Sequence, residues 1–83
     1  MTTAYDQAMS ALDEMLAEGG TAARLAEEIL SIENDYRNGA MSAEDRQALL
    51  EEIILIKAAN DRMLNEILVR RLVDIGRVIT AVA

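Results

Sequence analysis

The feature that most constrains this chain is the stretch from Ser42 to Ala83, which makes up about half of the 83 residues. It contains no Pro, has a single Gly at Gly76, and is rich in Ile, Leu and Val. Ser is a favoured N-cap residue, and two acidic residues follow in the first turn, where negative charge suits the helix dipole. This pattern predicts one long helix over residues 43–82.

Two shorter helices are predicted before it, over residues 3–18 and 21–37. In both, apolar residues recur at three- and four-residue spacing. Gly19-Gly20 ends the first and Asn38-Gly39 closes the second, because Gly adopts the left-handed C′ conformation easily. With no Pro and only two aromatic residues in the chain, we expect a single all-α domain over residues 1–83. The expected fold is a helical hairpin or a three-helix arrangement with a long C-terminal helix.

The junction from Asp35 to Asp45 resembles the helical hairpin of the short C-terminal domain (SHOCT) family. In that family a helix ends at Gly, two residues follow of which the second is apolar, and Ser or Thr caps a helix that opens with acidic residues. Here Gly39, Met41 and Ser42 occupy those positions. The resemblance implies protein–protein association rather than catalysis.

A helical wheel divides the long stretch into two halves. Residues 43–64 are amphipathic, whereas in residues 66–83 aliphatic side chains cover most of the circumference. A helix of about 40 residues is about 60 Å long, roughly twice the length of either predicted N-terminal helix. We therefore expect its C-terminal half to project from the rest of the chain and to require cover from another molecule.

Copies of the same chain are the simplest source of that cover, which predicts an oligomeric helix bundle or coiled coil. Asn60 could fix the register of such an assembly, or could form an ordinary hydrogen bond on a partly exposed face. Gly76 could permit close helix approach or a bend, or be tolerated near a helix end. The residues predicted to form the interface are Asn60, Met63, Leu64, Ile67, Leu68, Leu72, Ile75, Ile79 and Val82.

Composition argues against several functions. The absence of Cys and His excludes disulfides and zinc-type sites, and paired Glu residues without His do not form the usual carboxylate-bridged metal site of bundles. No phosphate-binding loop or nucleophile motif is present, so we expect no cofactor and no enzymatic activity. A net charge of −7 would repel nucleic acid.

The leading hypothesis is a non-enzymatic structural protein that self-associates through its C-terminal helix, and its composition resembles that of small phage or bacterial assembly components. The alternative is an acidic inhibitory or antitoxin-like protein, which would present an acidic second-helix face to a basic partner. The acidic face would consist of Glu27, Glu28, Glu33 and Asp35.

No apolar stretch reaches the about 20 residues that span a bilayer, and the N-terminus lacks signal-peptide features. We therefore expect a cytoplasmic protein, or a virion component if phage-derived.

Overall fold

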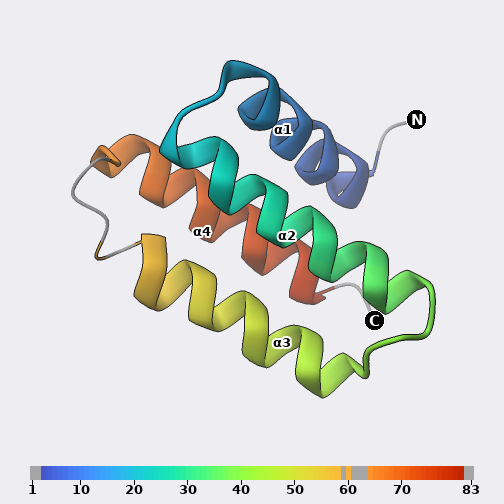
Figure 1. The fold of residues 1–83 in the computed structure, drawn as a ribbon. Helices are drawn as coiled ribbons and strands as arrows, with labels where there is room; N and C mark the ends of the chain where they lie inside the picture. The colour runs from blue at the N-terminus through green and yellow to red at the C-terminus, as the bar shows by residue number, and fades with distance from the viewer. Residues whose placement is uncertain (1–2, 59, 61–63, 82–83) are drawn as a thin grey trace.

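The chain folds into helices that run alternately in opposite directions (Figure 1). The computed structural model describes residues 3–58, 60 and 64–81. The α3 helix continues directly into a π-helix, η1, so the described elements form an all-α, compact four-helix arrangement. Their bounds are α1, Ala4–Glu18; α2, Thr21–Arg37; α3, Ala43–Glu51; η1, Glu52–Ala58; and α4, Glu66–Ala81.

Local capping chemistry sets where the first three helices begin. Thr3 and Asp6 form a capping box, in which the Asp6 amide donates to Thr3 Oγ1 at 3.1 Å and the Thr3 amide donates to the Asp6 carboxylate. Ser42 caps α3 by accepting a hydrogen bond from the Asp45 amide at 3.1 Å. Between α1 and α2, Gly19 and Gly20 have φ angles of 78° and 82°, which other residues adopt only at a steric cost.

Each helix packs against two neighbours. α1 contacts α2 and α4, and the α3–η1 segment also contacts α2 and α4. α1 and α3 therefore lie diagonally across the bundle, with α2 and α4 between them in Figure 1. The core between the helices is aliphatic, and its largest fully buried apolar side chains are Leu12, Met15, Ile29, Leu50, Leu72 and Ile79.

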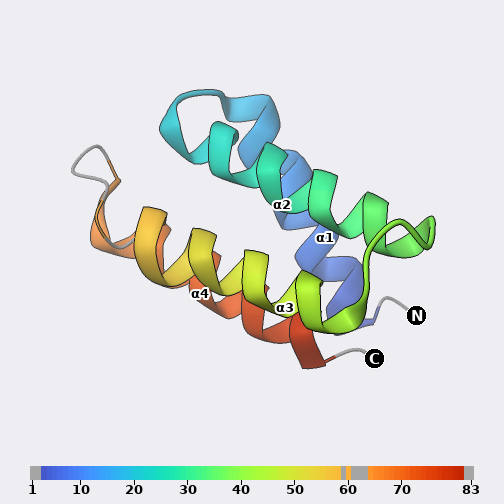
Figure 2. The same ribbon diagram turned by 60° about the horizontal axis from the view of Figure 1, so that its bottom comes forward.

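The prediction of one long helix over residues 43–82 is wrong. η1 ends at Ala58 and a separate helix begins at Glu66, running back along η1 (Figure 2). Asn65 caps this new helix, because its Oδ1 accepts a hydrogen bond from the Leu68 amide at 2.9 Å. Folding back lets the chain cover the apolar side of α4 with its own α1 and η1, so the C-terminal half does not project.

The π-helical turns of η1 change which residues face the core. A regular α-helix turns about 100° per residue, which would place Ala58 about 80° away from Leu50. Both residues are nevertheless fully buried, with 0% exposure, because the wider π turns bring Ala58 back to the inner side. The intervening residues Leu55 and Ile56 are left on the outer side, 63% and 57% exposed.

Gly76 allows α4 to lie close to η1. A Cβ atom placed on Gly76 would come within 1.8 Å of Ile54 Cδ1, so of the alternatives considered from the sequence, close helix approach is the one observed. In the described part of the chain we find no helix with the length and hydrophobicity of a bilayer-spanning segment.

The contact between Gly76 and Ile54 can be tested with a double-mutant cycle. We expect Gly76→Ala to destabilise the protein in the presence of Ile54, since Cδ1 must be displaced. In an Ile54→Val background, which lacks Cδ1, the same substitution should become neutral or stabilising, by up to about 1 kcal/mol, because Ala is the better helix former. Urea unfolding of the four variants measures the coupling free energy; additive effects would contradict the contact.

Candidate interaction surface

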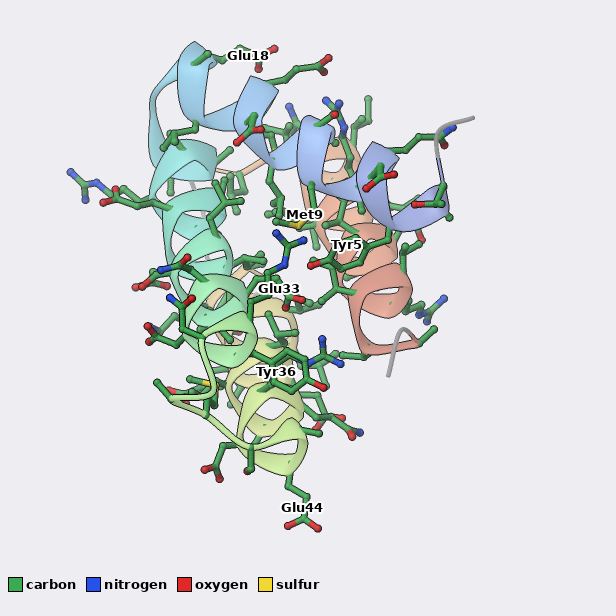
Figure 3. All side chains as sticks on the ribbon, turned by 90° about the vertical axis from the view of Figure 1, so that its right-hand side faces the viewer. Tyr5, Met9, Glu18, Glu33, Tyr36 and Glu44 are labelled. Carbon is green, nitrogen blue, oxygen red and sulfur yellow. The ribbon has the colours of Figure 1, made fainter. Side chains whose placement is uncertain are left out.

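A polar network that is buried at Glu33 and Arg46 and reaches the surface at Arg37 joins α1, α2 and α3; Figure 3 labels its Tyr5 and Glu33. Glu33 Oε1 accepts hydrogen bonds from the Tyr5 hydroxyl at 2.7 Å and from Arg46 Nη1 at 3.1 Å. Arg37 donates in turn to the Tyr5 hydroxyl through its Nε, at 3.0 Å. The network therefore links residues that lie far apart in the sequence.

The ion pair at the centre of this network is almost completely removed from solvent. Glu33 is 2% exposed and Arg46 is 4% exposed, and the Arg46 guanidinium carbon lies 4.0 Å from the centre of the Tyr36 ring. Desolvating two charges costs about as much as their attraction returns, so such a pair contributes more to the choice of one arrangement than to stability. We infer that this ion pair fixes the position of α3 relative to α2.

Glu33 was expected on an exposed acidic face, and that expectation is wrong. Glu33 follows the buried Ile29 by four residues, which places both on the same side of α2. The other acidic residues predicted there are exposed, but Glu28 pairs with Lys57 of η1 at 3.3 Å. Glu27 and Asp35 therefore remain as the exposed acidic residues of this set for which no ion pair is observed with any residue that the structure describes.

The residues predicted to form an oligomer interface are divided between the core and the surface. Leu72, Ile75 and Ile79 are buried inside their own chain, which corrects their assignment to an intermolecular contact. Leu64 and Leu68 are partly buried against the same core, whereas Asn60 and Ile67 are exposed. The remaining predicted interface residues, Met63 and Val82, lie outside the described residues.

An exposed apolar surface is found instead where η1 and α4 lie side by side. We call it the η1–α4 face. A hollow of about 200 Å³ opens there, with Leu55 on the η1 side, Val73 on the α4 side, and Leu50, Ile54 and Gly76 among its other lining residues. Glu51 of α3, Arg77 and Thr80 complete the lining.

This hollow shares lining residues with two neighbouring depressions. Glu51 and Leu55 also line a depression formed with Ala48, Glu52 and Ile56. On the other side, Val73 and Arg77 also line a depression along α4 that reaches Val69 and Arg70. The η1–α4 face therefore extends across the outer sides of α3, η1 and α4, with aliphatic side chains at its centre and charged residues at its edges.

Sequence reasoning did not identify this face because it assumed a regular helix. On an α-helical wheel Ile56 falls with the inward residues, yet it is 57% exposed. The run Ile53-Ile54-Leu55-Ile56 was the available signal, since four consecutive large apolar residues cannot all face one side of a helix. The Tyr5–Glu33–Arg46 network was also missed, although the four-residue spacing from Ile29 to Glu33 pointed to an inward Glu33.

Comparison of the chain with protein-family models, with curated proteins and with solved structures gave no match. The resemblance of residues 35–45 to the SHOCT hairpin therefore stays a prediction. Among the described residues, no group of three or more acidic side chains is placed to hold a metal ion.

Breaking the buried ion pair should cost much more stability than replacing both of its members. We expect Arg46→Met alone to destabilise the protein by about 3–5 kcal/mol, because it leaves the Glu33 carboxylate buried without its charge partner. Glu33→Leu combined with Arg46→Met should recover most of that loss. Urea unfolding monitored by circular dichroism measures the difference; a double variant as unstable as the single one would contradict this assignment.

The Tyr5 hydroxyl should make stability fall at alkaline pH. Burial raises the pKa of Tyr5, and the hydrogen bond to Glu33 raises it further, while Arg37 opposes the shift. Since the ordinary pKa of tyrosine is about 10, this contribution is complete below about pH 10 and is lost as the pH rises through the pKa of the folded protein.

The stability difference between the wild type and Tyr5→Phe isolates that contribution, because the two proteins differ only in the Tyr5 hydroxyl. We expect the stability of the wild type to fall relative to that of Tyr5→Phe above about pH 10. Urea unfolding at a series of pH values measures this change. An unchanged difference across this range would show that the pKa of Tyr5 is not raised.

Proposed function

We propose that this protein is a non-enzymatic assembly module that self-associates through the η1–α4 face. The observation that carries the proposal is the outward placement of Leu55 and Ile56, 63% and 57% exposed on consecutive positions of η1. Burial of exposed aliphatic side chains lowers the free energy by about 25 cal/mol per Å² of apolar surface. Isolated exposed apolar residues are ordinary, but a continuous apolar patch is typical of an interaction site.

The shape of the face also supports an association role. The hollow between η1 and α4 has Leu50 and Ile54 among its lining residues, both of which are buried. A side chain from another molecule could therefore enter an aliphatic pocket instead of resting on a flat surface. Apolar centres with charged rims are the usual anatomy of protein–protein interfaces.

The irregular geometry of η1 points to the same surface. A π-helical segment costs hydrogen-bond geometry relative to an α-helix, and such segments occur frequently at functional sites. Here the π turns are what leave Leu55 and Ile56 outside the bundle. The association surface we propose thus differs from the one expected from the sequence, because the central residues of the latter, such as Leu72, are used inside the chain.

The alternative of an acidic inhibitor is less well supported. Of the four acidic residues it requires, Glu33 is buried in an ion pair with Arg46 and Glu28 pairs with Lys57. The face that would meet a basic partner is therefore reduced to Glu27 and Asp35. We do not propose this function.

Self-association can be tested by placing a charge at the centre of the η1–α4 face. We expect Leu55→Glu to lower the weight-average molar mass measured by light scattering to that of a monomer, because a carboxylate would have to be desolvated in an apolar contact. Leu16→Glu is the matched control, since Leu16 is also exposed, at 41%, but lies on α1, which does not line the η1–α4 face.

The control should retain the molar mass of the wild type. Circular dichroism of both variants verifies that they are folded. A wild-type protein that stays monomeric at all concentrations, or equal effects of the two substitutions, would contradict the proposed function.

A further inference from the structure

Two opposite charges that have no ionic partner in the described part of the chain lie on the two rims of the η1–α4 face. Glu51 on α3 and Arg77 on α4 line the same hollow, and both are exposed. Other cations of η1 and α4 are paired within the chain: Lys57 with Glu28, Arg70 with Glu66 and Arg71 with Glu14. No ion pair is observed for Arg77 or Glu51 within residues 3–58, 60 and 64–81.

We propose that the η1–α4 face binds a second copy of itself about a two-fold axis that runs along the groove between η1 and α4. This inference rests on the proposed function and specifies its partner and geometry. Rotation about that axis places the α4 rim of one copy over the α3–η1 rim of the other. Each Glu51 then faces the Arg77 of the other copy, so that two equivalent ion pairs flank the apolar centre.

Charge favours a second copy as the occupant. A face with Glu51 on one rim and Arg77 on the other is complementary to itself after a two-fold rotation, and no other partner is needed to explain these two charges. The chain has a net charge of −7, so two copies repel one another unless the contact brings cations opposite anions. The rotation does so for Glu51 and also brings Glu52 towards the α4 rim, which carries Arg70, Asp74 and Arg77.

The apolar centre of the face fits the same arrangement. Leu55 and Val73 lie on opposite walls of the hollow, so the rotation places Leu55 of each copy over Val73 of the other. The aliphatic contact supplies the affinity, while the rim charges set orientation and reject wrong pairings. The orientation is therefore controlled by two residues that can be exchanged without disturbing the core.

A charge-exchange experiment tests this geometry. Glu51→Arg gives one variant a positive charge at both positions, and Arg77→Glu gives the other a negative charge at both. We expect each variant alone to associate at least about tenfold more weakly than the wild type, since every rim pair becomes repulsive. An equimolar mixture should form a heterodimer with an affinity within about threefold of the wild-type value, measured by analytical ultracentrifugation.

Control variants separate this specific effect from a change in net charge. Glu27→Arg and Arg24→Glu make the same changes of two charge units on α2, where both residues are exposed. We expect no preference of these two variants for one another in a mixture. The chain that carries both Glu51→Arg and Arg77→Glu should dimerise like the wild type.

The outcomes distinguish this inference from the proposed function. If the wild type self-associates and Leu55→Glu abolishes association, but the mixed charge variants do not associate, the two-fold geometry is overturned and the function stands. If the wild type is a monomer at all concentrations, the proposed function itself is overturned. Restoration in the double variant without restoration in the mixture would show that Glu51 and Arg77 interact within one chain, which also overturns the pairing between copies.

Discussion

The burial of α4 inside its own chain is the constraint on which the rest of the structure depends. Leu72 and Ile79 are both 0% exposed, and α4 contacts α1 on one side and η1 on the other. A chain of this size has little apolar area to bury, so a helix left outside would remove much of its core. With α4 in place, the outer side of that helix and of η1 becomes the surface available to other molecules.

Polar interactions add specificity to this aliphatic core. The Glu33–Arg46 pair and the Tyr5 hydroxyl hold α1, α2 and α3 at defined positions, whereas aliphatic side chains alone permit several arrangements of similar energy. Gly76 acts at the other side of the bundle, where it lets α4 approach Ile54. The fold is thus determined by a few close contacts between helices that propensity alone would not position.

The sequence predicts the all-α class and the cap at Ser42, because capping depends on neighbouring residues only. It does not predict the break before α4, since no Pro or Gly marks it and the cap is a single Asn65 within a helix-favouring stretch. The exposed position of Leu55 was equally hidden, because a change from α to π turns is decided by tertiary contacts. For the same reason, the predicted interface residues Leu72, Ile75 and Ile79 proved to be core residues.

The π turns of η1 connect helix geometry to association by thermodynamic linkage. The turns that return Ala58 to the core also hold Leu55 and Ile56 outside it. Any molecule that binds these outward side chains binds the π form more tightly than a regular α-helix, and by reciprocity stabilises the π form. Hydrogen exchange of the amides in η1 would therefore report whether the η1–α4 face is occupied.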